Sequence, residues 1–478
     1  MSRLAHRDDP AMSESVRERV SRFARRRSME RSDFQHLFRR PVRRRTVIVG
    51  IGTAALGGLL AACRGGGATP TPTTAPATPT PAAATPTPAA ATPTPAAAAT
   101  PTVVVTPAAA AEPIRIGLIH GYTGVFAALA ENLTRGIQLA FESIDNTVAG
   151  RKVTFVQEDD ASNPEQGLTK TKQLVERDKV HLIIGYIHSG VALACRDYIH
   201  QSGVPTIIDN AGAQAITRDP QRRSPYIFRV SFANGQYEWP MGQYAFEQLG
   251  YKRLAFMAPD YAAGHEKAEP VKAAFQKAGG EIAGEVYPPL DTSDFAPFLQ
   301  RIQQAQPDAV WAFFAGADAV RFVTQYQDFG LKDQIPLIGV GDLVDEAYLD
   351  QQGDAALDVV TSLHYSPYID SPENKAFVDA FKKKYGRVPN QFAYQGYLAA
   401  LVAAKALEAV QGKVEDTQAF LKALKGVQFT GPAGPFRFHP ETQNVVITVY
   451  FRKVQRLPDG TLGNVVLGKR ENVDDLSF

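Results

Sequence analysis

Short apolar segments alternate with amphipathic ones from residue 114 onward, and this alternation constrains the fold more than any other feature of the chain. Ile114–Ile119 has the length and apolar character of a buried strand, and Phe126–Ile144 places its apolar residues near one face of a helix. The succession continues to Ile208 and restarts at Arg253. Strands that alternate with helices form βαβ units, whose parallel sheet is covered by helices on both faces. Two such sets predict an α/β protein with two Rossmann-like lobes.

The other strands and helices of both sets are placed by their apolar spacing. In the first set we expect strands at Val153–Gln157, His181–Ile187 and Val204–Ile208, and helices at Pro164–Arg177 and Val191–Gln201. In the second set we expect strands at Arg253–Ala258, Glu281–Tyr287, Ala309–Phe314 and Leu337–Val340, and helices at Glu266–Ala278, Phe295–Ala305 and Ala319–Phe329. Two long helices and a strand-rich segment follow, at Lys375–Tyr385, Tyr394–Val410 and Val445–Val454.

Residues 1–62 have the features of an export signal. An arginine cluster at 43–45 precedes an uncharged apolar run at 46–60, which is short for a membrane-spanning helix. The run ends in Leu60-Ala61-Ala62-Cys63, which resembles a bacterial lipobox, and so we expect Cys63 to be the lipid-attachment site. An uncleaved membrane anchor is the alternative. The arginine pair also resembles a twin-arginine signal, although the general secretory route stays open.

The segment 63–111 separates this signal from the alternating region. It repeats Thr-Pro and Ala-Ala blocks, contains eleven prolines after Cys63 and carries no charge between Arg64 and Glu112. Such a composition cannot bury an apolar core and stays extended. We therefore expect a Thr/Pro/Ala-rich tether between the lipid and the folded body.

The charge balance and the cysteines exclude two classes of protein. The chain has a net charge of +2, but residues 1–45 hold 14 Lys and Arg against 6 Asp and Glu, so the chain from Cys63 onward carries −6. A mildly acidic body lacks the basic surface that nucleic acid requires, and we expect no nucleic-acid partner. With Cys195 as the only other cysteine, a disulfide framework is also excluded.

The loops that follow the predicted strands are the candidate binding region, because parallel α/β sheets bind ligands outside the carboxyl ends of their strands. These loops are rich in glycine, hydroxyl and aromatic residues and contain few charges, which suits a small polar ligand. They lie at residues 121–124, 186–190, 209–212, 260–264, 315–318 and 341–342.

The body from Ile114 to about Val454 resembles the type I periplasmic binding proteins of the leucine/isoleucine/valine-binding family. No single stretch is specific, but the matching stretches occur in order over some 340 residues. They are Thr123-Gly124, Gln157-Glu158-Asp159-Asp160 with Asn163-Pro164, Ile184-Gly185 through Ser189-Gly190, Gly203-Val204-Pro205-Thr206-Ile207, Ile227-Phe228-Arg229 and Asp260-Tyr261-Ala262-Ala263-Gly264.

This resemblance implies a fold in which the chain crosses three times between two lobes that close on ligand by hinge motion. We expect the crossings near Ser231–Gly235, Ser362–Ser366 and Gln428–Pro435. Lobe 1 would then comprise residues 112–232 and 365–428, and lobe 2 residues 233–364 and 429–478.

The resemblance also implies the function. We expect an extracytoplasmic solute-binding lipoprotein of an ABC importer, held on the cell membrane by its N-terminal lipid and facing the periplasm or the cell exterior. Its partners would be a membrane permease and a small carboxylate ligand. The ligand class stays open between an amino acid of the branched-chain type and an aromatic or aliphatic carboxylate.

The carboxylate site is predicted at Ser189 and Gly190, which precede the helix expected from Val191. A helix N-terminus offers unpaired N–H groups and a partial positive charge, and family members bind the ligand carboxylate there. An ordinary serine cap is the alternative. His188 could donate to the carboxylate, stack on a ring or be structural.

A second contact loop is implied at Asn210, Ala211 and Gly212, where glycine stands near the position of a hydroxyl found in branched-chain amino-acid binders. Asp342 is one position from the acid that pairs with an amino-acid ammonium in that family, and a capping role is its alternative. The remaining candidates are apolar walls and flanking loop positions, at Tyr122, Thr123, Phe126, Tyr261, Phe314 and Gly316.

An enzyme and a sensor are the competing functions. His188 and Ser189 are adjacent in sequence, but adjacency does not form a catalytic triad, and no Gly-x-Ser-x-Gly motif surrounds the serine. No metal-ligand spacing stands out among the histidines and cysteines, so we expect no enzymatic activity, cofactor or metal. The ligand-sensing subunit of a separate membrane signalling receptor remains the alternative function.

Overall fold

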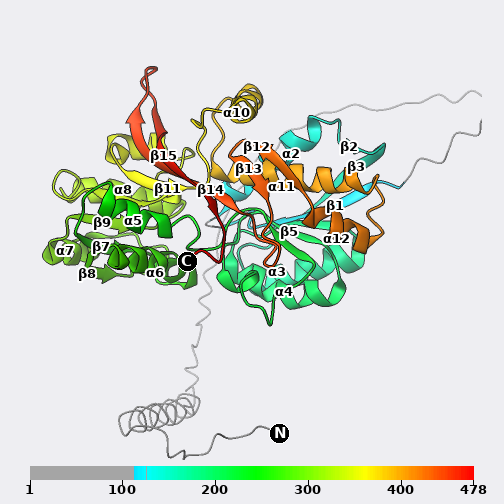
Figure 1. Ribbon diagram of the computed structural model, residues 1–478, viewed down its shortest axis with the longest axis horizontal. Helices are drawn as coiled ribbons and strands as arrows, with labels where there is room; N and C mark the ends of the chain where they lie inside the picture. The colour runs from blue at the N-terminus through cyan, green and yellow to red at the C-terminus, as the bar shows by residue number, and fades with distance from the viewer. Residues whose placement is uncertain (1–111, 125) are drawn as a thin grey trace, which may run out of the picture. The chain divides into compact units, whose positions relative to one another are not determined.

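The computed structural model describes residues 112–124 and 126–478, whose helices and strands are labelled in Figure 1. The predicted export signal, the lipid-attachment cysteine and the tether lie outside these described residues. The described body contains two parallel-dominated sheets with helices against them, as the alternation of the sequence predicts.

The first sheet has six strands in the order β2-β3-β1-β4-β5-β6, and all neighbours are parallel except β2 and β3. The central strand places Ile116 beside Phe155 on one side and Leu182 on the other. The strands are β1 Ile114–His120, β2 Thr147–Val148, β3 Arg151–Asp159, β4 Leu182–Gly185, β5 Thr206–Ile208 and β6 Ile227–Arg229.

Helices cover both faces of this sheet because its strands carry apolar side chains on both faces. Ile116 and Leu118 pack with the helices α2 and α11, whereas Ile119 and Ile183 pack with α3, its π-helical extension and α4. The helices are α2 Ala127–Glu142, α3 Pro164–Lys172, α4 Ser189–Ser202, α10 Pro372–Tyr385, α11 Gln391–Ala409 and α12 Thr417–Lys425, with the extension at Gln173–Arg177.

The second sheet has seven strands in the order β15-β14-β11-β10-β9-β7-β8, in which β14 and β15 are antiparallel additions to a parallel set. Its strands are β7 Arg253–Met257, β8 Glu281–Val286, β9 Ala309–Ala312, β10 Leu337–Val340, β11 Val360–Leu363, β14 Ile447–Arg456 and β15 Leu462–Val473. Its helices are α5 Trp239–Glu247, α6 Ala262–Lys277, α7 Ala296–Ala305, α8 Ala317–Asp328 and α9 Leu349–Gln352.

Short elements complete the body. They are the 3₁₀ turns Gln214–Ile216, Gly341–Val344 and Gly353–Ala356 and the two-stranded ribbon of β12 Gln428–Gly431 and β13 Gly434–Arg437. The chain passes from β6 to the second sheet, leaves it after β11 for the helices α10 to α12, and returns to it at β14. This course has the three crossings that the resemblance implies, and we keep the predicted lobe limits as a proposal.

A close helix contact fixes α11 against α2. A Cβ atom on Gly136 of α2 would lie 2.0 Å from the carbonyl oxygen of Ala393, and one on Gly396 of α11 would lie 2.0 Å from that of Leu133. Both positions therefore require glycine, since the helix backbones approach within contact of each other. The consequence is a rigid support for the N-terminal ends of both helices, which reach the candidate site.

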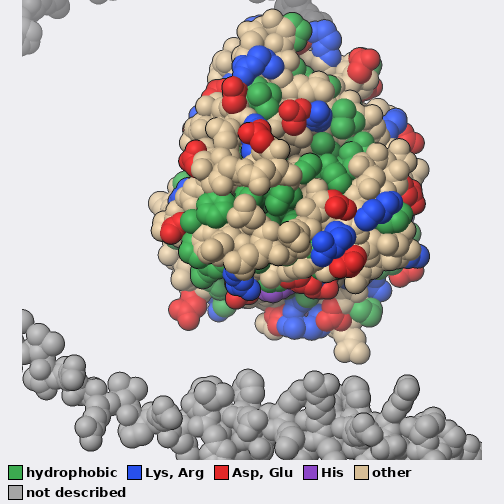
Figure 2. Space-filling model, turned by 90° about the vertical axis from the view of Figure 1, so that its left-hand side faces the viewer, with side chains coloured by type: hydrophobic (Ala, Val, Ile, Leu, Met, Phe, Trp, Pro, Cys, Tyr) green, Lys and Arg blue, Asp and Glu red, His purple; other side chains and the backbone are tan. Residues whose placement is uncertain are grey.

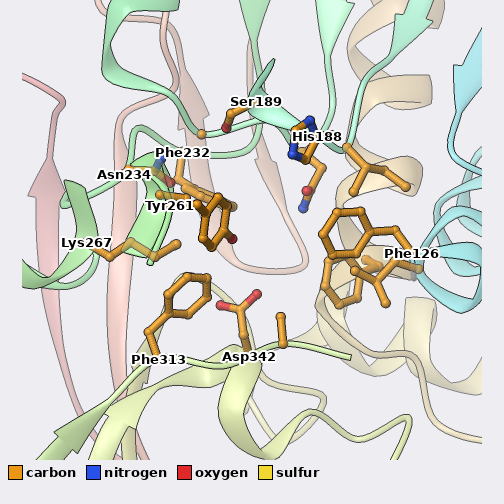
Figure 3. Close-up of a pocket in the computed structure, with 16 residues that line it drawn as sticks. Phe126, His188, Ser189, Phe232, Asn234, Tyr261, Lys267, Phe313 and Asp342 are labelled. Carbon is orange, nitrogen blue, oxygen red and sulfur yellow. The ribbon is translucent and has the colours of Figure 1, made fainter. Parts of the chain in front are cut away.

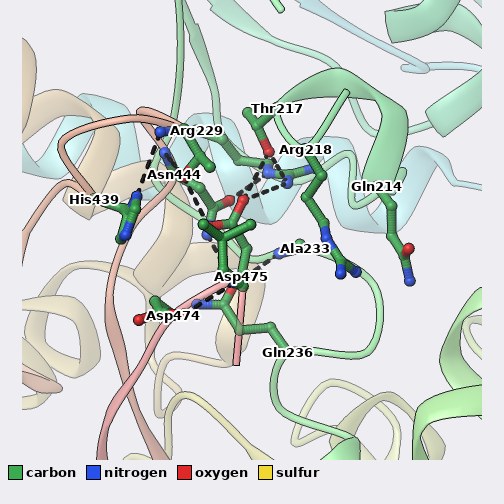
Figure 4. Close-up of polar contacts among 12 residues, drawn as sticks. Gln214, Thr217, Arg218, Arg229, Ala233, Gln236, His439, Asn444, Asp474 and Asp475 are labelled. Carbon is green, nitrogen blue, oxygen red and sulfur yellow. Dashed lines mark hydrogen bonds and ion pairs between the residues drawn. The ribbon is translucent and has the colours of Figure 1, made fainter. Parts of the chain in front are cut away.

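A buried polar cluster joins the ends of β6, β14 and β15 (Figure 4). Arg229 at the end of β6 donates to the side chains of Asn444 and Thr217 and to the carbonyl of Ala213 at 2.8 Å. Asp475, which follows β15, accepts from the hydroxyl of Thr217 at 3.1 Å. Segments far apart in sequence are thus held together where the chain crosses between the sheets.

Charged side chains are mixed on the surface. Figure 2 shows one face on which Lys and Arg side chains stand among Asp and Glu side chains, with apolar side chains between them. Within the described residues, no helix is long and apolar enough to cross a membrane.

The predicted α/β class is confirmed, and most predicted elements are present with ends shifted by at most four residues. Two shifts concern the candidate site. Helix α4 begins at Ser189 rather than Val191, and β9 ends at Ala312 rather than Phe314. Elements that the sequence did not suggest include β6, α5, β11, α12 and the hairpin partner β15.

Candidate ligand-binding site

A cavity lies where the loops after strands of both sheets meet (Figure 3). Its empty volume is about 460 Å³, which includes space open to solvent. The loops after β4, β5 and β6 line one side, and those after β7, β9 and β10 line the other. The lining residues are Phe126, Leu129, Ile187, His188, Ser189, Asn210, Gly212, Phe232, Asn234, Tyr261, Ala263, Lys267, Phe313, Ala315, Asp342 and Phe392.

The N-terminus of α4 forms one end of the cavity. The first helical bond runs from the N–H of Ala192 to the carbonyl of His188 at 3.1 Å, so the amide groups of the preceding turn have no helical acceptor. The hydroxyl oxygen of Ser189 accepts from the N–H of Ala213 at 3.1 Å. Its hydrogen is therefore directed elsewhere and can be donated to a ligand. This end is built to hold an anionic group.

His188 adds a neutral ring beside this helix end. Burial lowers its pKa, so the imidazole is uncharged at neutral pH. Its Nδ1 is buried and has no hydrogen-bond partner among the described residues. The ring stacks on Phe126, with 6.1 Å between the ring centroids and 30° between the planes. His188 can therefore contribute one donor and one flat face to a bound molecule.

Aromatic rings from several elements form the sides of the cavity. Phe126 precedes α2, Phe232 follows β6, and Phe392 lies in the first turn of α11. Tyr261 and Phe313 follow β7 and β9, and their centroids are 6.4 Å apart. Rings on facing walls favour a flat apolar ligand, which gains stacking contacts in addition to the burial of its surface.

A buried ion pair lies at the side of the cavity. Lys267 is 3% exposed and donates to the carboxylate of Glu238, which is fully buried, and to the hydroxyl of Tyr237 at 2.6 Å. Its ammonium also lies 4.5 Å from the ring centroid of Phe232 and 5.0 Å from that of Phe313. Burial raises the pKa of Glu238, but the contact with Lys267 opposes this effect.

Asp342 lies at the end of the cavity opposite Ser189 (Figure 3). It is the second residue of the 3₁₀ turn after β10 and is 6% exposed. Its Oδ2 accepts from the hydroxyl of Tyr237 at 2.9 Å, which links it through that hydroxyl to Lys267. The site therefore has a donor-rich end at α4 and an acceptor at Asp342.

Gly212 makes room for two residues of the wall. A Cβ atom at this position would lie 2.2 Å from Oδ1 of Asn234 and 2.6 Å from Cε2 of Phe232. Phe232 and Asn234 thus already fill the space that a side chain at position 212 would need. Nearby, Asn210 is held by a 2.7 Å bond from its Nδ2 to the side-chain oxygen of Gln395.

Seven of the predicted binding residues line this cavity, and six do not. Those in the lining are Phe126, His188, Ser189, Asn210, Gly212, Tyr261 and Asp342. Those outside the lining are Tyr122, Thr123, Gly190, Ala211, Phe314 and Gly316.

Local contacts explain the positions outside the lining. The Tyr122 hydroxyl bonds to Thr134 at 2.8 Å beside another surface hollow, and Thr123 donates to Asp159 at 2.7 Å. Ala211 is fully buried, and Gly190 lies within the first turn of α4. These residues support the binding loops rather than face the cavity.

Phe313 forms the aromatic wall that was expected from Phe314, so the predicted position was wrong by one residue. Phe314 points to the opposite side of the chain and packs between Phe295 and Phe322, with centroids 5.1 and 4.5 Å away. Successive residues of an extended segment face opposite sides, so the assignment depends on where β9 ends. Gly316 caps α8, and its neighbour Ala315 lines the cavity instead.

Sequence reasoning missed Phe232, Asn234, Lys267 and Phe392 as lining residues. Phe232 and Asn234 lie in the predicted crossing segment, but the strand β6 that precedes them was not predicted, so no strand end pointed to them. Lys267 and Phe392 lie within helices, where sequence spacing gives no indication of a cavity. Within residues 112–124 and 126–478, no group of His, Cys, Asp and Glu is arranged to hold a metal ion.

The sequence profile of a family described as periplasmic binding protein matches residues 113–461. Among curated proteins, the chain is 33% identical over 365 residues to "Leu/Ile/Val-binding protein homolog 6" of Brucella melitensis, covering 75% of this chain and 91% of that protein.

Solved structures of similar fold include substrate-binding proteins of ABC transporters. One from Sphaerobacter thermophilus is 50% identical, with a TM-score of 0.74, and the match covers 77% of this chain and all of that chain. One from Rhodopseudomonas palustris BisB5, in complex with 3,4-dihydroxybenzoic acid, is 37% identical with a TM-score of 0.72, covering 76% of this chain and 98% of that chain.

Proposed function

Because the chain belongs to the periplasmic binding protein family, we propose that it captures a small aromatic carboxylate between its two lobes and delivers it to a membrane permease. The resemblance seen in the sequence is confirmed, and the fold is that of the type I members. The chain is an ABC transporter substrate-binding protein and not an enzyme, and its family implies an extracytoplasmic location.

The observation that carries the ligand class is a cavity with aromatic walls that ends at the N-terminus of α4. The rings of Phe126, Tyr261 and Phe313 suit a flat apolar body, and the α4 amides with Ser189 suit a carboxylate. The ligand in the Rhodopseudomonas palustris protein is an acid of this kind. An aromatic carboxylate matches both features with one small molecule.

A branched-chain amino acid is the second candidate, and Asp342 is the observation that favours it. A carboxylate inside the cavity is a partner for an ammonium group, and the curated relative is named for leucine, isoleucine and valine binding. However, Phe232 and Asn234 fill the space beside Gly212 where amino-acid binders of the family carry a hydroxyl. This departure supports the aromatic acid as the first choice.

Delivery requires that the permease distinguish the loaded protein from the empty one. Ligand contacts come from loops of both sheets, so a bound molecule stabilises the arrangement in which the two sets of loops face each other. We propose that this closed form docks on the permease. No observation favours the alternative of a sensing subunit.

We further propose that Cys63 carries the lipid and that the segment 63–111 is the tether. The motif Leu60-Ala61-Ala62-Cys63 after an apolar run supports this assignment. Replacement Cys63→Ser should move the protein from the detergent phase to the aqueous phase in a phase-separation assay. An unchanged distribution would contradict the lipid anchor.

Calorimetric titration tests the ligand class. The Cys63→Ser protein, unfolded and refolded to remove retained ligand, is titrated with 4-hydroxybenzoate and with leucine under the same conditions. We expect a saturable heat with the aromatic acid and none with leucine. Binding of leucine alone would replace the proposal by the amino-acid candidate, and silence with both would refute the two ligand classes.

A further inference from the structure

The two ends of the cavity differ in hydrogen-bonding character. Ser189 and the start of α4 offer donors at one end, whereas Asp342 offers a carboxylate at the other, with aromatic rings between them (Figure 3). A simple aromatic carboxylate would satisfy only the donor end. The chemistry of the Asp342 end therefore carries information about the rest of the ligand.

The Asp342 carboxylate receives one donor from the protein side chains around it. Tyr237 donates to its Oδ2 at 2.9 Å, and the contacts of the described residues give it no ion-pair partner within 4.0 Å. A carboxylate has about four acceptor positions, and the Tyr237 hydroxyl occupies one of them. The side chain of Asp342 points into the cavity (Figure 3), so the free acceptor positions face the ligand.

Lys267 sets the direction of the Tyr237 hydrogen. The ammonium donates to the hydroxyl oxygen of Tyr237 at 2.6 Å, and so the hydroxyl hydrogen is left for Asp342. Glu238 accepts from the same ammonium and holds it in place. Lys267 thus donates to Tyr237, and Tyr237 donates to Asp342. Asp342 therefore remains an acceptor toward the cavity.

We propose that the ligand carries a hydrogen-bond donor at the end opposite its carboxylate, a para hydroxyl on an aromatic acid, which Asp342 accepts. Lys267 and Tyr237 are positioning residues that keep Asp342 in this acceptor role. This inference rests on the proposed binding of an aromatic carboxylate and specifies its substitution.

Positional isomers of one acid test whether the ligand needs a hydroxyl opposite its carboxylate. The Cys63→Ser full chain is titrated with benzoate, 4-hydroxybenzoate and 2-hydroxybenzoate. A hydrogen bond to a charged acceptor gives 4-hydroxybenzoate a dissociation constant about 10- to 100-fold lower than that of benzoate. The 2-hydroxy isomer, whose hydroxyl lies beside the carboxylate, should gain no such advantage.

The outcomes separate this inference from the proposed function. Equal affinity for benzoate and 4-hydroxybenzoate would overturn the role of Asp342 and leave the binding of aromatic acids intact. No binding of any of the three acids would instead refute the proposed function. An equal gain from the 2-hydroxy and 4-hydroxy groups would also overturn the inference, since only one of them lies opposite the carboxylate.

The variants Asp342→Asn and Tyr237→Phe test whether these two residues determine the recognition of the para hydroxyl. Asp342→Asn removes the charge at nearly constant size, and Tyr237→Phe removes only the hydroxyl that joins Lys267 to Asp342. Both should lower the preference for 4-hydroxybenzoate over benzoate by about tenfold. Asp318→Asn is the matched control, because Asp318 is equally buried at 6% exposed but does not line the cavity.

Lys267→Met tests the positioning role, with Lys272→Met as its control. Lys272 lies on the same helix and is 7% exposed, but it pairs with Glu269 and Glu285 away from the cavity. The Lys267 variant should lower the preference ratio and the Lys272 variant should not. An equal loss of both acids in folded Lys267→Met protein would overturn the positioning role. If that variant does not fold, Tyr237→Phe decides the question.

Discussion

Replacement of Gly212 by alanine tests whether the wall of the cavity is as closely packed as the structure indicates. The added Cβ atom would lie 2.2 Å from Oδ1 of Asn234 and 2.6 Å from Cε2 of Phe232, so both side chains must move. Asn234 is held at its backbone by a 2.6 Å bond to the carbonyl of Gly212 and at its side chain by a 2.9 Å bond to Glu266. Its movement therefore strains or breaks contacts that join the two sides of the site.

The magnitude follows from these contacts. Inserting an atom into a packed region costs about 1–3 kcal/mol, and a hydrogen bond to a charged group contributes about 1.5–3 kcal/mol. Glu266 is only half-buried, so its bond belongs at the low end of that range. We expect Gly212→Ala to lower the free energy of unfolding by about 2–4 kcal/mol. Displacement of Phe232 into the cavity should also weaken 4-hydroxybenzoate binding about tenfold or more.

Urea unfolding followed by circular dichroism measures the first effect, and calorimetric titration measures the second. Gly468→Ala is the control, because a Cβ atom at that position in β15 meets nothing within 4 Å. The control should change stability by no more than about 0.5 kcal/mol. If Gly212→Ala matched this control in both assays, the close packing of Phe232 and Asn234 on Gly212 would be refuted.

Three further predictions concern the helix end, the buried cluster and pH. Ser189→Ala should weaken carboxylate binding about 10-fold or more in calorimetry, since it removes a donor to a charged group, and should lower the free energy of unfolding by about 1 kcal/mol, since it removes the acceptor of the Ala213 N–H; an unchanged affinity would remove Ser189 from the site. Asp475→Ala leaves the fully buried Arg229 without its nearby carboxylate and should lower the free energy of unfolding by about 3–5 kcal/mol in urea titrations, whereas a loss below 1 kcal/mol would contradict this. Burial lowers the pKa of His364 to about 3, below its value of about 6.5 in the unfolded chain, so the unfolded state binds more protons between these values. The free energy of unfolding should therefore fall as the pH drops below about 6.5. Between pH 7 and pH 5 it should fall by roughly 2 kcal/mol less in the His364→Gln protein than in the wild type. Parallel curves of stability against pH for the two proteins would exclude His364 as a cause.

The sequence predicts the fold well because buried strands and amphipathic helices leave clearly different patterns of apolar residues in the chain. Segments such as Leu337–Val340 are continuous apolar runs, and their number and order identify two parallel sheets. The missed elements have weaker signals. β6 has three residues. Most residues of β15 along Leu462–Val473 are half-buried or exposed, so the place of this strand depends on pairing with β14 rather than on its own composition.

The candidate site is less predictable, since it depends on which side chain of a loop turns inward. Ser189 and Tyr261 follow from the rule that ligands lie beyond the carboxyl ends of parallel strands. The choice between Phe313 and Phe314 depends on the last residue of β9, which periodicity locates only to within one or two positions. Lys267 is five residues into α6, and its bond to the Tyr237 hydroxyl arises from tertiary packing alone.

A crystal structure of the protein with 4-hydroxybenzoate would show directly how a ligand lies in the cavity. We expect the ring between the aromatic walls, the carboxylate on Ser189 and the first amides of α4, and the hydroxyl on Asp342. A carboxylate bound to Lys267 with the hydroxyl directed toward α4, or an acid bound outside this cavity, would contradict this arrangement.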